Sequence, residues 1–257
     1  MPPITHLTLV ESTNTWLRNH PDTGSDLCVV AAKQTAGRGQ GTNSWESEPG
    51  KNLTFSLLTH PKGVSAAEQY LLSMAMAVAV RDAATAASPE ANAAAFSIKW
   101  PNDIYWHDRK LAGILIECAL HGSEIRRCIT GVGLNVYQHH FLSDAPNPVA
   151  LCQTGNIAPD LLDNDRLLRD LLGRYAANMQ RPEDTRNAYR RHLYRRNGLH
   201  PYRDAEGTFM AETVDVDDRG TLLLRDQAGR LRQYQFKQVQ FIIPDRQKTN
   251  SKSLLSR

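Results

Sequence analysis

Residues 96–136, FSIKWPNDIYWHDRKLAGILIECALHGSEIRRCITGVGLNV, contain four strand-like runs in close succession. Each run is apolar or β-branched and ends at a short polar break; the runs are Phe96–Trp100, Ile104–Trp106, Leu111–Leu120 and Glu124–Val136. The first break, Pro101-Asn102-Asp103, has turn chemistry, because proline restricts φ and the Asn and Asp side chains can bond back to the backbone. This stretch predicts a β-sheet.

The chain on either side of this stretch supplies helices that can cover the sheet. Ser12 offers a helix cap before Trp16, and a long helix is expected over Ala66–Ala87, where apolar residues recur at helical spacing. Met74 and Met76 in this helix are interpreted as core residues. Further strands are predicted at His6–Val10, Leu27–Ala32 and Leu53–Thr59, and further helices from Asp163 to about Met179 and from Pro182 to about Arg196.

The sequence changes character after Gly198-Leu199-His200-Pro201, which is interpreted as a break between elements. Short strands joined by hairpin turns follow, at Thr208–Val216, Thr221–Arg225, Leu231–Phe236 and Val239–Ile243. They predict a small β-barrel. The expected organisation is an α+β domain with a mixed sheet over residues 1–197, a β domain over 198–245 and a disordered basic tail over 246–257.

The composition is typical of a globular protein: 41% of the residues are hydrophobic, 22% are charged, and the net charge of +3 does not require a nucleic-acid partner. No apolar run approaches the about 20 residues of a membrane span. The four cysteines show no C-x-x-C spacing, so that no metal site is predicted and buried, reduced thiols are expected. These features predict a soluble, cytoplasmic protein without a membrane partner.

Three features indicate an anionic ligand. In Gln34–Gly41, glycines flank Arg38, which lets backbone N–H groups approach an anion while the guanidinium adds positive charge. Lys99 ends a predicted strand and can neutralise a carboxylate and the phosphoryl group that it attacks. Gly131 and Gly133 lie inside a predicted strand, which suggests close approach by a ligand or another backbone. Each feature alone also fits an ordinary surface turn, a solvated cation or a β-bulge.

The order of these features along the chain resembles the biotin–protein ligase family (biotin–[acetyl-CoA-carboxylase] ligases). The motifs that carry the resemblance are, in order, Ser12-Thr13-Asn14, Lys33-Gln34-Thr35-Ala36-Gly37-Arg38-Gly39, Trp45, Lys99-Trp100-Pro101-Asn102-Asp103, Lys110-Leu111-Ala112-Gly113-Ile114-Leu115-Ile116-Glu117 and Gly131-Val132-Gly133-Leu134-Asn135. They cover about residues 7–137, and the C-terminal strands resemble the family's SH3-like domain in pattern only. The resemblance implies the mixed-sheet catalytic fold of biotin and lipoate ligases, with helices packed on the sheet.

The resemblance also implies a reaction. The family forms biotinyl-5'-AMP from biotin and ATP, with Mg²⁺ on the phosphates, and then transfers biotin to one lysine of a biotin carboxyl carrier protein of acetyl-CoA carboxylase or a related carboxylase. Because the biotin carboxylate and the triphosphate repel each other, catalysis needs cations where negative charge develops. Arg38 and Lys99 are the implied catalytic residues.

Site residues follow from the same resemblance. The residues implied to contact biotin are Ser12, Thr13, Asn14, Gln34, Arg38, Gly39, Gln40, Lys99 and Gly113. The residues implied to contact the nucleotide are Trp45, Asn102, Lys110 and Asn135. Hydroxyl and amide groups suit a ureido ring, which needs both donors and acceptors, and Trp45 can stack on adenine.

Two departures from the family pattern bear on function. Many members have a second arginine at the position of Gln40, where it helps to retain the adenylate, so that weaker retention is expected here. Bifunctional members begin with a DNA-reading helix-turn-helix, whereas the first family-like motif here begins at Ser12; a monofunctional ligase without a DNA partner is therefore expected. The arginine cluster at 186–196 is interpreted as a solvated basic helix face, with docking of an acidic carrier protein as the alternative.

Other readings of the sequence remain open. A lipoate–protein ligase shares the fold and the acyl-adenylate chemistry, but is expected to have a different lysine motif. A protein that binds biotin without ligating it would not need both Arg38 and Lys99, and both are present. A homodimer is also left open, with the strand near Glu124–Val136 as the candidate edge.

Overall fold

The computed structural model describes residues 1–142, 147–155, 157 and 162–243. Seven strands form one mixed sheet, in the order β1 (Ile4–Leu7), β2 (Leu27–Ala31), β3 (Asn52–Thr59), β7 (Glu124–Asn135), β6 (Arg109–His121), β5 (Asp103–Trp106) and β4 (Phe96–Lys99). Only the β1–β2 pair is parallel, and every other neighbour is antiparallel. The mixed sheet predicted from the sequence is confirmed.

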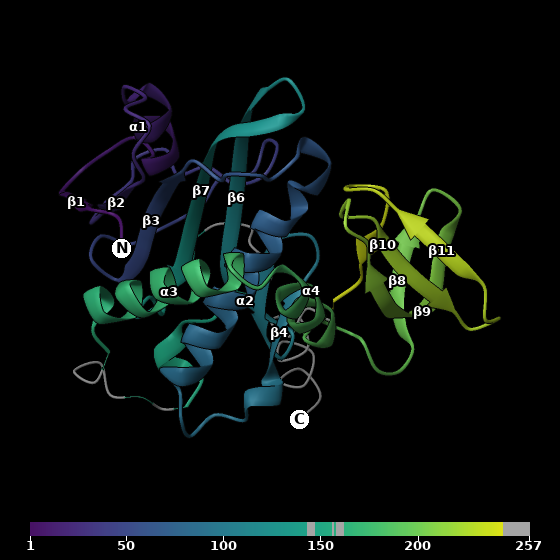
Figure 1. Cartoon of the computed structure of the whole chain (residues 1–257). Helices are drawn as coiled ribbons and strands as arrows, with labels where there is room; N and C mark the ends of the chain where they lie inside the picture. The colour runs from purple at the N-terminus through teal and green to yellow at the C-terminus, as the bar shows by residue number, and fades with distance from the viewer. Residues whose placement is uncertain (143–146, 156, 158–161, 244–257) are drawn as a thin grey trace, which may run out of the picture.

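Three helices, α2 (Tyr70–Ala86), α3 (Asn164–Met179) and α4 (Pro182–Arg191), lie together on one face of this sheet (Figure 1). Helix α2 is apolar around most of its circumference, because the sheet lies on one side of it and the other helices on the other; Met74 and Met76 are fully buried, as expected. None of the helices in the described part of the chain has the length and apolar composition of a membrane span.

The short helix α1 (Thr13–Asn19) packs on the opposite face of the sheet. Successive residues of a strand point to opposite faces, so Leu57 of β3 joins the core under α2, whereas Leu58 joins Leu17 of α1 in a separate cluster. Ser12 caps the helix, as the sequence predicts, with its hydroxyl accepting from the Thr15 N–H at 3.5 Å. The first turn of α1 therefore lies above the sheet face that the three large helices leave open.

The structure corrects several predicted boundaries. The first strand runs over Ile4–Leu7, earlier than predicted, and the helix predicted over Ala66–Ala87 is divided into a 3-10 turn at Ala66–Glu68 and α2. Helix α4 ends at Arg191 and not near Arg196. It ends early because the backbone of the following residues pairs with β4: the Ile98 N–H donates to the His192 carbonyl at 2.7 Å.

The C-terminal part forms a second, antiparallel sheet of five strands, in the order β11 (Leu231–Tyr234), β10 (Leu222–Asp226), β9 (Gly207–Val216), β8 (His200–Asp204) and β12 (Gln240–Phe241). Strand β8 was missed, because Gly198 and Pro201 were interpreted as a break; Pro201 instead lies in a strand and is paired with Met210. Within the described residues, β11 and β12 form the two edges and do not pair with each other. The basic tail at 246–257 lies outside the described residues.

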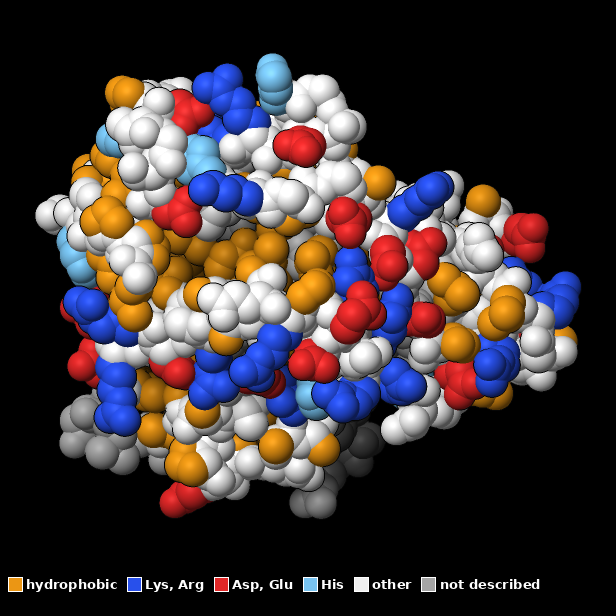
Figure 2. All heavy atoms as spheres, viewed as in Figure 1, with side chains coloured by type: hydrophobic (Ala, Val, Ile, Leu, Met, Phe, Trp, Pro, Cys, Tyr) orange, Lys and Arg blue, Asp and Glu red, His pale blue; other side chains and the backbone are white. Residues whose placement is uncertain are grey.

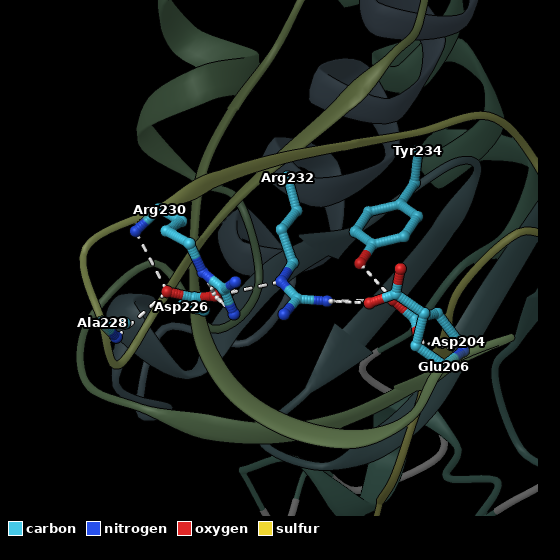
Figure 3. A network of polar contacts seen from close by, with 7 residues as sticks. All are labelled: Asp204, Glu206, Asp226, Ala228, Arg230, Arg232 and Tyr234. Carbon is cyan, nitrogen blue, oxygen red and sulfur yellow. Dashed lines mark hydrogen bonds and ion pairs between the residues drawn. The ribbon is translucent and has the colours of Figure 1, made fainter.

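A polar network stabilises the outer end of this second sheet (Figure 3). Burial alone would raise the pKa of Asp226, but hydrogen bonds from the Arg230 N–H and from the side chains of Arg232 and Arg230 hold this pKa at about 2. The Arg232 guanidinium reaches Asp204 at 3.3 Å, and the Tyr234 hydroxyl donates to Asp204 at 2.6 Å. These charge-assisted bonds connect the β8–β9 hairpin to the β10–β11 hairpin.

Helix α4 holds the second sheet against the first unit by ion pairs. Arg186 contacts Asp218 at 3.3 Å and Glu183 at 2.8 Å, while Arg190 contacts Asp215 at 3.0 Å and Asp218 at 3.1 Å. Figure 2 shows acidic and basic side chains gathered in the region between α4 and the C-terminal sheet. The prediction of a solvated basic face is therefore wrong for Arg186 and Arg190, which are paired with acids of the same chain, whereas Arg191, the third arginine of α4, is exposed.

Strand β7 lies between β3 and β6 in the middle of the seven-stranded sheet. The expectation that the strand near Glu124–Val136 offers an edge for a second copy is therefore wrong. A sequence pattern can identify a strand, but its neighbours depend on the order in which the chain returns to the sheet.

Candidate active site

A pocket of about 220 Å³ lies on the sheet face that carries α1. Four segments far apart in the sequence meet there: the start of α1, the glycine-rich loop after β2, the turn between β4 and β5, and the centres of β6 and β7. The predicted site residues that line it are Ser12, Thr13, Asn14, Gln34, Arg38, Gly39, Gln40, Trp45, Lys99, Asn102, Lys110 and Gly113. Phe236, from the C-terminal sheet, completes the lining.

The start of α1 contributes a buried set of donors and acceptors. The Gln34 side-chain oxygen accepts from the Thr13 N–H at 2.8 Å, and the Ser56 hydroxyl lies 2.7 Å from the Thr13 hydroxyl and 2.6 Å from Asn14 Oδ1. Asn14 Nδ2 donates to Glu117 at 2.9 Å. Because these side chains hold one another, a polar ligand meets groups that are already oriented.

Arg38 is held in the pocket by Glu117 of β6, with 3.0 Å between Nη1 and Oε1. Burial alone would raise the pKa of Glu117, but the Asn14 hydrogen bond and the guanidinium groups of Arg38 and Arg18 lower it below its usual value. Glu117 is therefore anionic and orients both Asn14 and Arg38. Glu117 lies within one of the family-like motifs but had no predicted role; the signal available in the sequence is that it is the one acid inside the apolar run 111–120.

Asp103 lies between two lysines at the other side of the pocket. Its carboxylate is 2.7 Å from Lys110 Nζ and 3.8 Å from Lys99 Nζ. The Lys99 ammonium also lies 4.9 Å from the ring centre of Phe241, in the C-terminal sheet. Burial lowers the pKa of Lys99, and the attraction of Asp103 offsets this only in part. Two cations thus share one acid.

The glycines of the two central strands leave room for side chains from other segments. A Cβ on Gly131 would lie 2.1 Å from Asn14 Oδ1, and a Cβ on Gly133 would lie 2.1 Å from the Trp45 indole. Register places Gly133 beside Gly113, whose Cβ would lie 3.1 Å from the same indole. Other groups do approach these two glycines closely, but they are the side chains of Asn14 and Trp45 and not the ligand or backbone that the sequence suggested.

Two predicted nucleotide-side residues have structural contacts of their own. Asn102 donates its side-chain amide to the Ile114 carbonyl, and the Ile114 N–H donates to the Asn102 carbonyl at 2.9 Å, so Asn102 ties the turn to β6. Asn135 is not among the residues that line the pocket; its amide donates to the Val149 carbonyl at 3.2 Å, and the residue is buried. It lies at the far end of β7, opposite Asn52.

The described residues contain no group of three or more His, Cys, Asp or Glu side chains that could hold a metal ion. All four cysteines are free; Cys28, Cys128 and Cys152 are buried, and Cys118 is partly exposed with its sulfur 3.6 Å from that of Cys128. The pocket lining itself offers amides, hydroxyls and cations.

Residues 7–135 match the model of the biotin/lipoate A/B protein ligase family. The chain is 32% identical over 242 residues to the biotin–[acetyl-CoA-carboxylase] ligase of Paracoccus denitrificans, which covers 87% of this chain and 95% of that protein. It is 30% identical over 220 residues to the bifunctional ligase/repressor BirA of Bacillus subtilis, covering 78% of this chain. The chain spans 62% of the length of that repressor and of its Bacillus spizizenii counterpart.

Solved structures of similar fold include a biotin protein ligase from Aquifex aeolicus in complex with biotin and ATP, with a TM-score of 0.75 at 22% identity. That match covers 95% of this chain and 100% of the other. A biotin protein ligase from Leishmania major in complex with biotinyl-5-AMP has a TM-score of 0.64 over 91% of this chain, at 22% identity. The sequence matches show that the chain belongs to the biotin/lipoate A/B protein ligase family, and the fold agrees with this.

Proposed function

We propose that this protein is a biotin–protein ligase that activates biotin with ATP and transfers it to a lysine of a biotin carboxyl carrier protein. The observation that carries the proposal is the meeting, in one pocket, of a polar cluster at Thr13–Asn14 with the cations Arg38, Lys99 and Lys110. The polar cluster suits an uncharged ring with donors and acceptors, and the cations suit two anions that must react with each other.

In the first step, a biotin carboxylate oxygen attacks the α-phosphorus of ATP, and the bond to the β-phosphate oxygen breaks to release pyrophosphate. The cations Arg38, Lys99 and Lys110 reduce the repulsion between the anions and stabilise the charge that develops in the transition state. In the second step, the amine of the carrier lysine attacks the biotinyl carbonyl, loses a proton and displaces AMP. Positioning and electrostatics supply the catalysis, without a covalent enzyme intermediate.

The two lysines differ in what they can reach. Lys110 Nζ lies 5.7 Å from the ring centre of Trp45, close to Gly113 in the pocket floor. Lys99 Nζ lies between Asp103 and the aromatic rings of Tyr105 and Phe241, beside the C-terminal sheet. We therefore propose that Lys99 and Lys110 act as a pair across Asp103, with Lys110 at the pocket centre and Lys99 holding the local charge positive.

The remaining assignments are part of the same proposal. The residues proposed to bind biotin are Ser12, Thr13, Asn14, Gln34, Gly39, Gln40 and Gly113, with Arg38 and Lys99 at the carboxylate. Trp45, Asn102 and Lys110 are proposed on the nucleotide side. Mg²⁺ would be held chiefly by the phosphates, because the carboxylate in the pocket lining, Asp103, is already engaged by two lysines. Asn135 is left out of the site.

The proposed organisation divides the chain near residue 198. The seven-stranded sheet and its helices form the proposed catalytic domain at 1–197, and the five-stranded sheet is proposed as an SH3-like domain at 198–245. Its antiparallel strand order β11-β10-β9-β8-β12 is compatible with a small open barrel. The free cysteine pair Cys118 and Cys128 supports a reducing compartment, and we propose the cytoplasm.

Pyrophosphate release by the purified protein tests the proposed reaction. We expect release that requires ATP and biotin, followed by labelling of an added biotin carboxyl carrier domain on one lysine. Release that responds to lipoate and not to biotin would identify a lipoate–protein ligase instead. Biotin binding without pyrophosphate release would identify a binding protein.

Gly131→Ala should raise the KM for biotin about tenfold, because the new methyl group must displace Asn14 and break hydrogen bonds worth about 1–3 kcal/mol. Biotin-dependent pyrophosphate release measures this change. Gly173→Ala is the matched control: Gly173 is exposed in the middle of α3, and a Cβ there would have no atom within 4 Å beyond the backbone of its own helix and its chain neighbours. That variant should keep its KM and gain about 0.5–1 kcal/mol of stability. An unchanged KM in both would contradict the role of Asn14.

Gln40→Arg should slow the release of the adenylate about tenfold, because a guanidinium in the glycine-rich loop can form a charge-assisted bond to its phosphate. The enzyme is loaded with labelled biotin and ATP, and the labelled adenylate that leaves the protein is followed during a chase. Gln40→Lys places a point charge at the same position and should have a smaller effect. Equal release from the wild type and both variants would exclude this position from phosphate binding.

A further inference from the structure

The turn between β11 and β12 brings a lysine from the C-terminal sheet to the glycine-rich loop. Lys237 lies in this turn, directly after Phe236, which lines the pocket. Its ammonium is so close to the loop that a Cβ placed on Gly41 would lie 3.0 Å from Lys237 Nζ. Gly41 follows Gln40, so the cation lies beside the part of the loop that has no charge of its own.

The backbone at Lys237 has a left-handed conformation, with φ of +69°. This conformation is unfavourable for a residue with a Cβ and is natural for glycine. A lysine at such a position therefore carries a cost in stability that a glycine would not. Strained residues of this kind concentrate where a side chain serves a ligand.

Lys237 also differs from the cations that line the pocket, because each of those is paired with an acid. Arg38 shares Glu117 with Arg18, and Lys99 and Lys110 share Asp103. Within the described residues, Lys237 forms no ion pair with a carboxylate; its Nζ lies 5.6 Å from the ring centroid of Phe236. Lys237 does not itself line the pocket, but Phe236 before it does, so an unpaired positive charge lies beside the pocket and next to the glycine-rich loop.

We infer that Lys237 is a phosphate-binding residue of the adenylate site, supplied by the C-terminal sheet to a loop whose only arginine is already paired with an acid. The inference rests on the proposed function, because it takes the bound anion to be the phosphate of biotinyl-5'-AMP. An exposed lysine can hold this phosphate by a charge-assisted bond once the loop closes on it. The C-terminal sheet then contributes directly to retention of the intermediate.

Lys237→Gln tests the inference by removing the charge and keeping a long polar side chain. Labelled adenylate should leave the loaded variant about tenfold faster than the wild type, and its release should depend less on salt. Lys237→Arg should retain the adenylate. Lys62→Gln is the matched control: Lys62 is exposed in another turn and, unlike Lys237, has no atom within 4 Å of the Cβ position of Gly41, so that its loss should change nothing.

Lys237→Gly separates binding from folding, because the two effects have opposite signs. Glycine suits a φ of +69°, so the melting temperature should hold or rise, while adenylate release accelerates as in Lys237→Gln. Adding Gln40→Arg to Lys237→Gln should restore slow release, because it returns a cation to the same end of the loop.

Two outcomes would overturn the inference. One is release from Lys237→Gln and Lys237→Gly at the wild-type rate; the other is faster release that Lys237→Arg shares. Both require that the wild type forms the adenylate, which biotin-dependent pyrophosphate release establishes separately. If the wild type releases no pyrophosphate with biotin, the proposed function itself fails, and this is distinct from failure at Lys237.

Discussion

Arg38→Ala should lower kcat/KM for biotin-dependent pyrophosphate release by about 10²–10³, or about 3–4 kcal/mol, which is typical for loss of one oriented donor at a developing charge. The guanidinium lines the pocket and is fixed by Glu117 at 3.0 Å, so it needs no reorganisation when the anions meet. Alanine removes this charge and leaves Glu117, behind the pocket lining, paired with Arg18 alone.

Arg18→Ala is the control for this prediction. Arg18 pairs with the same Glu117 carboxylate but does not line the pocket. Its loss should therefore change the rate by less than about tenfold, in line with the small contribution of an exposed ion pair. Equal losses for the two variants would mean that Arg38 acts only by neutralising Glu117. Near-normal adenylation by Arg38→Ala would refute its catalytic role.

Lys99→Ala should cost several kcal/mol of transition-state stabilisation, about 3–4 by the same comparison. The variant leaves Lys110 as the one lysine paired with Asp103. The net charge of this cluster of side chains therefore falls from positive to zero. Single-turnover adenylation measures the effect, and Lys110→Ala is measured beside it. A loss in Lys110→Ala with normal adenylation in Lys99→Ala would assign the charge at the pocket centre to Lys110 alone.

The lowered pKa of Lys99 predicts a specific pH dependence. The ammonium is lost as pH rises through this pKa, so adenylation should decline at a pH below that at which an exposed lysine titrates. Asp103 opposes this shift, whereas Lys110 and Arg195 reinforce it. Bound anions favour the charged lysine, so the decline in kcat should lie at higher pH than the decline in kcat/KM. The alkaline decline should be absent from the residual activity of Lys99→Met.

The same lowered pKa predicts that stability rises with pH over the range in which activity falls. Between the lowered pKa and that of the unfolded chain, the unfolded state binds more protons at this lysine, so the free energy of unfolding should rise with pH over that window. Lys99→Met should lack this contribution. Urea unfolding of the wild type and the variant at several alkaline pH values measures the difference.

Local sequence determined most of the elements and most of the pocket. Ser12 caps α1, Asp163 caps α3, and the four runs at 96–136 became β4 to β7, because capping groups, turn residues and apolar periodicity act within a few residues. The glycines at 131 and 133 suggested close approach by another group, because glycine weakens a strand interior, although a β-bulge would explain them as well.

Tertiary structure decided the interaction partners of the side chains that contact distant segments. Glu117 and Asp103 acquire their roles only where β6 meets α1 and where β5 meets β6, and Arg190 of α4 is paired with Asp218, 28 residues away in the C-terminal part. Helix α4 ends early because the backbone of β4 pairs with the residues that follow it. Lys237 lies beside Gly41 although the two residues are far apart in the sequence. A sequence pattern specifies what a residue can bind within its own turn or strand. Which charge stands opposite it depends on the packing of the folded chain, because Coulomb and hydrogen-bond interactions act over a few ångströms of space and not of sequence.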